Sequence, residues 1–505
     1  MQLVHSFLED SAARMPGKLA LVCGEARLTY AEIEAMANRL AQALVAHGVG
    51  RGDRVLLFLP NCVELVVGIF ATLKANAVFV PVNHSTKAEK LRFLAHDCRA
   101  AGLITGQRQA ETAVSLQPTI PSLKTIVVVG DAVPDGCLSF AGIQETFAAE
   151  RPSAQTIDQD LACLIYTSGS TGEPKGVMSA HHNVVFAAAS IISYLQNQPD
   201  DIVLNVLPLS FDYGLYQLLM TFKFGGTLVL ERSFAYPAHI LKRLVAEKVT
   251  GFPLVPTIAA ILLQLDLSPY DFSNLRYLTN TAAALSPSHI TALQEKFPAA
   301  TLFSMYGLTE TKRTLYLPPE QLAIRPGSVG VAIPGTEVWL EDEAGRRLGP
   351  GEIGELVIRG SHVMRGYWER PEASAARFRP GAIPGERLCY SGDLFRVDSD
   401  GYYYFIGRKD DIIKSRGEKV APKEIENVLC GLSGVVETAV IGIPDPILGE
   451  AIKAFVVAKD ASLTEQDVLR YCRQHLEEFM VPQQIAFCAA LPKSSNGKIA
   501  KKELK

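Results

Sequence analysis

The feature that most constrains the fold is an alternation of short apolar runs and helical patterns between about residues 50 and 310. Residues 53–59 and 78–82 have the composition of buried strands, and residues 63–74 between them have the spacing of an amphipathic helix. The alternation returns at residues 201–207, from about 214, and at 227–230, 254–265, 286–297 and 302–305. Strand–helix–strand alternation indicates largely parallel sheets covered by helices.

After about residue 330 the pattern changes to short strands separated by Gly-rich turns, which predicts a small β subdomain over about residues 330–409. From residue 410 the chain becomes basic and charge-dense, with two strand patterns and two helical patterns. We therefore predict an α/β fold with two domains. Residues 1–409 form a large N-terminal domain of helix-covered, mostly parallel sheets plus the β subdomain, and residues 410–505 form a small mobile α+β lid.

Composition excludes several classes of function. A chain of 505 residues with 48% hydrophobic content can bury a large core, and its net charge of -4 gives no indication of nucleic acid or of an anionic membrane. Nine scattered cysteines form no Cys-x-x-Cys pair or Cys/His cluster, which argues against zinc and a disulfide framework. No signal-peptide pattern or membrane-length apolar run is present. We expect a cytoplasmic protein that binds neither nucleic acid nor membranes.

The strongest chemical motif lies at residues 164–177, where an apolar run enters a segment of hydroxyl-bearing residues and glycines that ends at Lys175. Hydroxyl donors, glycines that allow close backbone approach, and one cation suit a polyphosphate. The Walker A spacing is absent, because Gly172 is followed by Glu-Pro-Lys. The alternative is a flexible Ser/Gly linker, but the apolar flanks and the Pro-Lys-Gly ending favour a phosphate-binding loop.

Four further segments carry reactive side chains. Residues 304–310 (Ser-Met-Tyr-Gly-Leu-Thr-Glu) are expected to follow a strand and begin a helix, near whose N-terminus anions bind. Residues 390–393 (Tyr-Ser-Gly-Asp) hold a carboxylate in a turn, residues 407–411 (Gly-Arg-Lys-Asp-Asp) lie at the expected domain boundary, and residues 496–498 (Asn-Gly-Lys) lie near the C-terminus. Each segment alone is a weak signal.

In this order and spacing, the segments resemble the adenylate-forming superfamily of acyl-CoA ligases, firefly-type luciferases and nonribosomal peptide synthetase adenylation domains. The resemblance covers essentially the whole chain and includes residues 28–33 and 73–81. Asn76 replaces the commoner glycine, and we expect an effect on local turn geometry alone. The resemblance implies that a carboxylate attacks the α-phosphate of ATP, releasing pyrophosphate, and that a thiol then takes the acyl group from the adenylate.

The resemblance also implies roles for individual residues. Thr309 would donate to the α-phosphate, Glu310 would hold Mg²⁺, a hard ion that prefers carboxylate oxygen, and Lys498 would bridge the substrate carboxylate and the phosphate. The β- and γ-phosphates would be cradled by Thr167, Ser168, Gly169, Ser170, Thr171, Gly172 and Lys175. The adenosine would be bound by Tyr306 stacking on adenine, by Ala282 and Ala283 lining the adjacent slot, by Asp393 accepting from the ribose hydroxyls, and by Arg408 close by.

In that family the C-terminal domain swings between the two half-reactions, and the resemblance implies a hinge at Asp410. The alternative is a surface charge in an Asp-Asp pair. Gly417 matches the region that lines the path of the thiol.

The substrate signal is the segment at residues 208–214 (Pro-Leu-Ser-Phe-Asp-Tyr-Gly). Phe211 stands where many acyl- and aryl-CoA ligases have histidine, and the segment is more similar to amino-acid-activating domains, whose matching aspartate, here Asp212, pairs with the α-ammonium group. Alternatively, Asp212 is only the N-cap of the following helix. The resemblance assigns the side-chain pocket to Tyr213, Tyr216, Met305 and Arg313.

Two tyrosines and a methionine suggest a compact, mostly apolar pocket, so we predict proline or a similar small amino acid as the substrate. Arg313, expected on the same helix face as Glu310, could neutralise Glu310 or Asp212, or could read an acidic substrate. The chain ends at Lys505, so the thiol is expected in trans, from the phosphopantetheine of a carrier protein. A CoA ligase is the alternative. A non-catalytic nucleotide-binding protein or a luciferase-like oxygenase is a more remote one.

Overall fold

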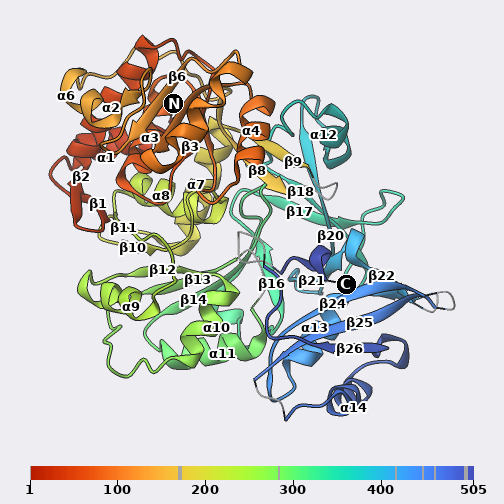
Figure 1. The fold of residues 1–505 in the computed structure, drawn as a ribbon. Helices are drawn as coiled ribbons and strands as arrows, with labels where there is room; N and C mark the ends of the chain where they lie inside the picture. The colour runs from red at the N-terminus through yellow and green to blue at the C-terminus, as the bar shows by residue number, and fades with distance from the viewer. Residues whose placement is uncertain are drawn as a thin grey trace.

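The computed structural model describes residues 2–168, 173–281, 285–415, 418–445, 448–459, 462–493 and 499–504. The described chain contains three sheets, two in the large N-terminal part and one in the small C-terminal part (Figure 1). This arrangement confirms the predicted α/β fold with a large domain of mostly parallel sheets and a smaller C-terminal domain. All nine cysteines are free thiols.

The first sheet has seven strands from the N-terminal third of the chain. In spatial order they are β7 (Leu138–Ser139), β6 (Thr125–Val129), β5 (Ala100–Gly106), β3 (Arg54–Phe58), β4 (Val78–Pro81), β8 (Leu161–Ser168) and β9 (Pro174–Ala180). All neighbours pair in parallel except β8 and β9, which form an antiparallel hairpin. The apolar runs at residues 53–59 and 78–82 are therefore buried parallel strands, as expected.

The second sheet has fourteen strands and combines two architectures. In spatial order its strands are β17 (Glu337–Glu341), β18 (Ile353–Arg359), β20 (Arg387–Val397), β21 (Tyr403–Arg408), β16 (Ser328–Ala332), β15 (Leu315–Leu317), β14 (Thr301–Tyr306), β13 (Tyr277–Asn280), β12 (Gly251–Leu254), β10 (Ile202–Asn205), β11 (Thr227–Leu230), β1 (Leu19–Cys23) and β2 (Ala26–Thr29), with β19 (Phe378–Pro380) paired to β20. Strands β10 to β14 pair in parallel with their neighbours. From β14 onward, through β15, β16, β21, β20, β18 and β17, all neighbours pair antiparallel. The predicted β subdomain thus continues the parallel sheet, which brings β20 and β21 close to β14.

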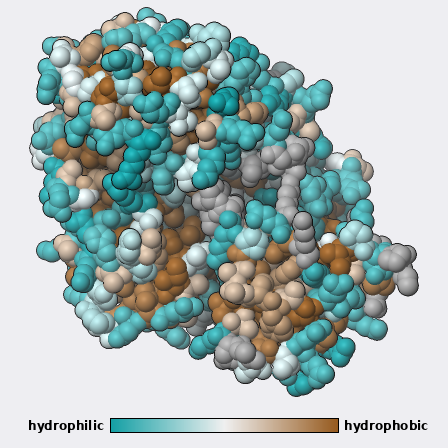
Figure 2. Space-filling view, in the orientation of Figure 1, coloured by the Kyte–Doolittle hydropathy of each residue, from teal (hydrophilic) through white to brown (hydrophobic). Residues whose placement is uncertain are grey.

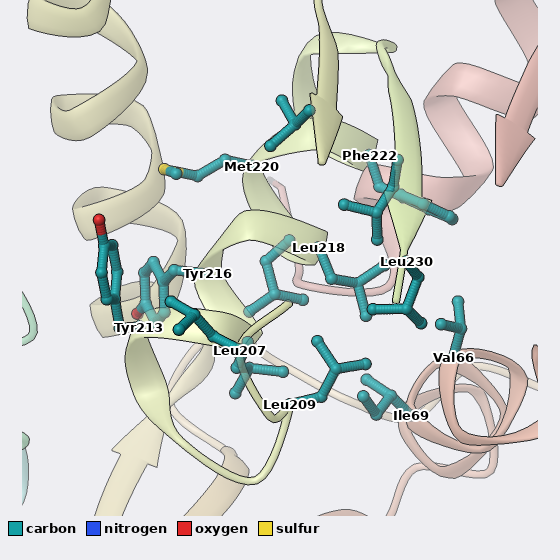
Figure 3. Close-up of a cluster of buried hydrophobic side chains, with 14 of the residues drawn as sticks. Val66, Ile69, Leu207, Leu209, Tyr213, Tyr216, Leu218, Met220, Phe222 and Leu230 are labelled. Carbon is teal, nitrogen blue, oxygen red and sulfur yellow. The ribbon is translucent and has the colours of Figure 1, made fainter. Parts of the chain in front are cut away.

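Helices cover and join the two large sheets. The helices of this part are α1 (Ser6–Arg14), α2 (Tyr30–Ala46), α3 (Val63–Lys74), α4 (Ala88–Asp97), α5 (Ala110–Val114), α6 (Phe140–Thr146), α7 (His181–Leu195), α8 (Asp212–Phe224), α9 (Pro237–Ala246), α10 (Pro256–Gln264), α11 (Pro287–Lys296) and α12 (Pro371–Arg377). Apolar residues of α3, α7 and α8 join both sheets in one core, in which the rings of Phe70 and Phe222 stack with centroids 5.2 Å apart. Figure 3 shows part of this core around α8. Burial of such side chains contributes about 1.5–3 kcal/mol each.

The C-terminal part has its own sheet and core. Its strands are β23 (Glu418–Val420), β22 (Ile413–Ser415), β25 (Gly449–Ala458), β24 (Val435–Asp445) and β26 (Gln484–Phe487), packed against α13 (Pro422–Cys430) and α14 (Glu465–His475). Figure 2 shows apolar side chains gathering on the surface of this C-terminal part. In the part of the chain that is described, no helix combines the length and the apolar character needed to cross a membrane.

Candidate active site

The expected phosphate-binding loop connects strands β8 and β9, which pair as an antiparallel hairpin. Thr167 on β8 is directly opposite Lys175 on β9. The Lys175 ammonium lies 5.7 Å from the ring centroid of Tyr367. Gly169, Ser170, Thr171 and Gly172 lie outside the described residues, as does the side chain of Ser168.

The structure corrects the helix expected after Tyr306: residues 307–312 form a turn. The chain reverses after β14, so that β15 pairs antiparallel with it. At Gly307 a Cβ atom would lie 1.9 Å from the carbonyl oxygen of Lys312, and Lys312 itself has a left-handed φ of 63°. The two arms of the turn approach so closely that position 307 has no room for a side chain, which only glycine tolerates. The anion-binding helix N-terminus predicted for this segment is therefore wrong, and Glu310 and Arg313 share no helix face.

Glu310 projects from this turn and is almost fully buried, with 8% of its surface exposed. The hydroxyl of Tyr367 donates a 2.5 Å hydrogen bond to Glu310 Oε1, and Arg377 Nε lies 3.9 Å from the same oxygen. Burial, with the Glu310 carboxylate beside it, raises the pKa of Tyr367. Burial alone would lower the pKa of Arg377, but Glu310 and the other acidic groups around it together outweigh burial, and the pKa is raised. The hydroxyl therefore stays protonated and the guanidinium charged.

Tyr367 and Arg377 were missed from the sequence. The aromatic pair after a glycine in residues 365–368 (Arg-Gly-Tyr-Trp) could have marked Tyr367. Arg377 ends an ordinary short helix, α12, and carries no comparable signal.

The residues present suit a magnesium ion held jointly with nucleotide phosphates. Among the described residues, no group of three or more His, Cys, Asp or Glu side chains could hold a metal by itself. Protein-bound Mg²⁺ typically uses one or two carboxylates together with substrate phosphates, so the single carboxylate of Glu310 fits this role.

A second buried carboxylate, Asp393, lies where ribose is expected. It is 4% exposed, and it accepts a 2.6 Å hydrogen bond on Oδ2 from the Tyr306 hydroxyl. Asp393 on β20 is directly opposite Arg408 on β21, whose Nε lies 3.6 Å from Asp393 Oδ1. The Tyr306 ring meets Phe395 edge-on, with centroids 5.0 Å apart. Ala282 and Ala283 lie outside the described residues, but β13, which precedes them, is the parallel neighbour of the strand that ends in Tyr306.

The structure describes the expected hinge, Asp410, but not the expected catalytic lysine, Lys498. Asp410 is exposed in the short 3₁₀ turn Lys409–Asp411, between the end of β21 and the start of β22 in the C-terminal sheet. Lys498 and Gly417 lie outside the described residues.

The predicted substrate segment leads from β10 into helix α8. The N-cap position is Phe211, which makes no side-chain capping bond, and Asp212 is the first helical residue, so the N-cap interpretation of Asp212 is wrong. Gly214 is required by close packing, because a Cβ there would lie 2.4 Å from the Pro208 carbonyl oxygen. The Phe-Asp-Tyr-Gly segment thus holds the start of α8 tightly against the end of the preceding loop.

Three of the predicted pocket residues come together around Asp212. Arg313 Nη1 lies 4.0 Å from Asp212 Oδ2, and the guanidinium lies 4.6 Å from the ring centroid of Tyr213. Tyr213 and Tyr216 lie next to each other at the start of α8 (Figure 3), and both are buried. Of the neutralising contacts considered for Arg313, the described structure shows the one with Asp212, whereas Arg377 is the arginine beside Glu310.

Two tyrosines outside the prediction help to build this region. The Tyr194 hydroxyl donates to Met305 Sδ at 2.8 Å, and the Tyr194 ring stacks on Tyr316 with centroids 4.2 Å apart. The Tyr213 hydroxyl donates to the Thr279 carbonyl at 2.8 Å.

The reactive groups follow the carboxyl ends of neighbouring parallel strands. The substrate segment follows β10, the alanines follow β13, and Tyr306 with the Glu310 turn follows β14. Ligands of open parallel sheets bind at this edge. Two buried carboxylates, together with a lysine on the β8–β9 hairpin, are the kinds of groups that can bind a nucleoside triphosphate and its metal ion.

Comparison with known proteins agrees with this geometry. Residues 8–368 match the model of the AMP-binding enzyme family, and residues 424–498 match that of the AMP-binding enzyme C-terminal domain. A feruloyl-CoA synthase from Amycolatopsis is 36% identical over 500 residues, covering 98% of this chain and 96% of that protein.

Solved structures extend the comparison. The anthranilate CoA ligase AuaEII in complex with anthranoyl-AMP superposes with a TM-score of 0.92 at 30% identity, covering 100% of this chain and 96% of that one. The o-succinylbenzoate CoA synthetase of Bacillus subtilis, in complex with ATP and magnesium, superposes with a TM-score of 0.86 at 26% identity, over 99% and 98% of the two chains. Adenylate-forming enzymes use ATP and Mg²⁺. The chain belongs to the AMP-binding enzyme family and is an ATP-dependent, AMP-forming ligase of the adenylate-forming superfamily.

Proposed function

We propose that this enzyme joins a small organic carboxylate to free CoA. The carboxylate attacks the α-phosphorus of ATP and pyrophosphate leaves. The CoA thiolate then attacks the acyl carbon of the adenylate, and AMP leaves with the electron pair of the broken acyl–oxygen bond. The single observation that carries the choice of acceptor is that relatives matched along nearly the whole chain are named as CoA ligases. They favour this alternative over activation of an amino acid for a carrier protein.

The contacts around Asp212 also count against an amino-acid substrate. Arg313 already lies 4.0 Å from the Asp212 carboxylate, in a region where Arg313 is only 3% exposed. An α-ammonium group arriving at Asp212 would be placed beside a guanidinium in a low-dielectric site, where like charges repel strongly. Proline would therefore bind poorly unless Arg313 moved away.

For adenylation, we assign complementary tasks to the two buried carboxylates. Glu310, fixed by Tyr367 and Arg377, would hold Mg²⁺. Asp393, fixed by Tyr306, would accept the ribose hydroxyls. Lys175 and the hairpin hydroxyls would hold the leaving pyrophosphate, while Thr309 and Lys498 would stabilise charge on the α-phosphate. Preorganised donors of this kind lower the barrier because they need no rearrangement during the reaction.

We also propose that residues 410–505 move as a lid on residues 1–409, with Asp410 as the hinge. The support is the position of Asp410, which is exposed between two sheets that share no strand. Few groups would have to be displaced for the backbone to rotate there.

A test of the acceptor uses the purified full chain with MgATP and a panel of aliphatic and aromatic acids. Each acid is offered with CoA or with a phosphopantetheinylated carrier protein, and the products are read by mass spectrometry. We expect acyl-CoA and AMP. Thioester formed only on the carrier would contradict the proposal. Lys498→Ala should lose adenylate formation while retaining ATP binding, and unchanged activity in that variant would refute the role of Lys498.

A further inference from the structure

The segment between β18 and α12 is bonded on one side to the turn that carries Glu310. This segment, residues 364–370, is called the strap below. The backbone N–H of Met364, at the start of the strap, donates to the Glu310 carbonyl at 3.0 Å. The hydroxyl of Tyr367, in the middle of the strap, donates to the Glu310 carboxylate. The strap therefore holds both the backbone and the side chain of Glu310.

The other side of the strap is bonded to β9, the strand that carries Lys175. The backbone N–H of Met178 donates to the Gly366 carbonyl at 2.9 Å, and the backbone N–H of Trp368 donates to the Gly176 carbonyl at 2.7 Å. The strap thus lies between the two elements that carry the proposed phosphate contact and the proposed metal ligand. A shift of the strap would change the distance between these two groups.

A single residue, Asp97 at the end of helix α4, joins the strap to the second strand of the hairpin. Arg370 Nη2 donates to Asp97 Oδ1 at 2.8 Å, and the indole N–H of Trp368 donates to the Asp97 carbonyl at 3.0 Å. The second carboxylate oxygen, Oδ2, accepts a 2.5 Å hydrogen bond from the Tyr166 hydroxyl on β8. The Tyr166 ring itself lies against β9, where a Cβ on Gly176 would come within 3.1 Å of it.

The Asp97 carboxylate is nearly enclosed, with 9% of its side chain exposed. Burying a charge costs free energy, and apolar residues of similar size often stabilise a fold equally well. A carboxylate that accepts directional bonds from two different segments, however, fixes their relative positions. Burial raises the pKa of Tyr166, so its hydroxyl stays protonated and continues to donate. These properties suit a residue that positions other groups.

We propose that Asp97 is a positioning residue for MgATP, which holds the strap against β8 and thereby keeps Lys175 and Glu310 at the separation that the triphosphate and its metal ion require. This inference rests on the proposed roles of Lys175 and Glu310 in adenylation. It adds a residue that acts on them through the strap and Tyr166. Groups held in place before the nucleotide arrives need not be ordered during the reaction.

The test measures MgATP affinity of the purified full chain by calorimetry, which needs no acid substrate. Asp97→Asn keeps the size of the side chain but removes its charge, and one of its two side-chain atoms can no longer accept a bond. Loss of groups that orient ligands typically costs 10- to 100-fold, and Asp97 acts one step further away, so we expect the Kd to rise by about 10-fold. In pyrophosphate exchange the KM for ATP should rise equally, with the KM for the acid unchanged at saturating ATP.

Asp201→Asn is the matched control. The Asp201 side chain is 4% exposed and accepts a 2.6 Å hydrogen bond from Arg276 Nη2, much as Asp97 does from Arg370. It precedes the start of β10, at the strand end opposite to the candidate site. Asp201→Asn should lower the unfolding temperature as Asp97→Asn does, yet leave MgATP affinity unchanged. Equal weakening of MgATP binding in both variants would reduce Asp97 to a structural role and refute the inference.

A double variant tests whether the effect passes through the strap. Arg370→Met removes the strap's donor to the Asp97 carboxylate and should weaken MgATP binding in the same direction. Combined with Asp97→Asn, it should weaken binding by clearly less than the product of the two single effects, because residues in one contact are not independent. Fully multiplicative losses would show that the two residues act separately, which contradicts the inference.

The outcomes separate the two proposals. If no acid supports exchange but Asp97→Asn still weakens MgATP binding, the ligase proposal fails and the positioning role of Asp97 stands. If exchange proceeds and Asp97→Asn binds MgATP as tightly as the wild type does, only the positioning inference fails.

Discussion

Replacing Tyr367 with phenylalanine tests whether Glu310 must be fixed in place for adenylation. The Tyr367 hydroxyl donates to Glu310 Oε1 at 2.5 Å, and the tyrosine is 8% exposed. The Tyr367→Phe variant keeps the ring and removes the donor. The ring also lies against Lys175, so its retention preserves that contact and isolates the hydroxyl.

The magnitude follows from the kind of bond that is lost. A hydrogen bond to a charged group contributes about 1.5–3 kcal/mol, and leaves its partner incompletely satisfied when it is removed. Arg377, whose Nε lies 3.9 Å from Glu310 Oε1, can move closer and recover part of the lost stabilisation of the carboxylate. We therefore expect kcat/KM for adenylation to fall by about 10- to 100-fold, in line with the loss of other groups that orient metal ligands.

The assay is pyrophosphate exchange at a series of Mg²⁺ concentrations, with the fold checked by circular dichroism. A positioning role predicts that higher Mg²⁺ partly restores Tyr367→Phe, because the loosened carboxylate binds the ion more weakly. Tyr390→Phe is the matched control, since the Tyr390 hydroxyl donates to Glu341 at 2.8 Å on strands that carry none of the proposed metal ligands. If both variants exchange at the wild-type rate, Glu310 needs no fixation and the reasoning is refuted.

Three further predictions concern the turn, the ribose site and pH. Gly307→Ala should abolish adenylation, because its Cβ would lie 1.9 Å from the Lys312 carbonyl oxygen and would displace Glu310, whereas Gly17→Ala, in open space, should leave exchange unchanged. Asp393→Ala should raise the KM for ATP by about 10²-fold in initial-rate assays, with kcat changing less. Burial lowers the pKa of His362 from 6.5 to about 4, so stability should fall as the pH drops through 6.5, by about 1.4 kcal/mol at about pH 5.5, and level off below 4. His362→Phe should remove that part of the acid sensitivity, measured as the change in unfolding temperature between about pH 7.5 and pH 5.5, and an unchanged difference would contradict the assignment.

The parallel-sheet core was predictable because local pattern and long-range packing agree there. Residues 53–59, 63–74 and 78–82 carry apolar runs of strand and helix period, and they form β3, α3 and β4. Asn76 also behaves as expected from the glycine it replaces, with a left-handed φ of 62°. Its amide further bonds to Ser153 and Gln155, so the side chain ties this turn to the segment that precedes β8.

The turn after β14 was not predictable from local pattern. Residues 307–312 contain few helix breakers beyond Gly307, and in such a fold a strand is commonly followed along the chain by a helix. The chain turns because β15 returns antiparallel to β14, and this brings Gly307 so close to the Lys312 carbonyl that no side chain would fit at position 307. Tyr367 and Arg377 were missed for a similar reason: they reach Glu310 from a loop and from the end of helix α12, and such long-range packing leaves no periodic mark in the sequence.

The substrate side shows a prediction that rested on the resemblance of one segment, residues 208–214. The sequence left open whether Arg313 neutralises Glu310, neutralises Asp212 or reads an acidic substrate. The observed turn directs Arg313 to Asp212, at 4.0 Å, and leaves Glu310 to Arg377. The aspartate that made an amino acid attractive is thus the counter-ion of an arginine. Because the buried Arg313 guanidinium would be costly without a counter-charge, the two residues have to be interpreted together, as an ion pair.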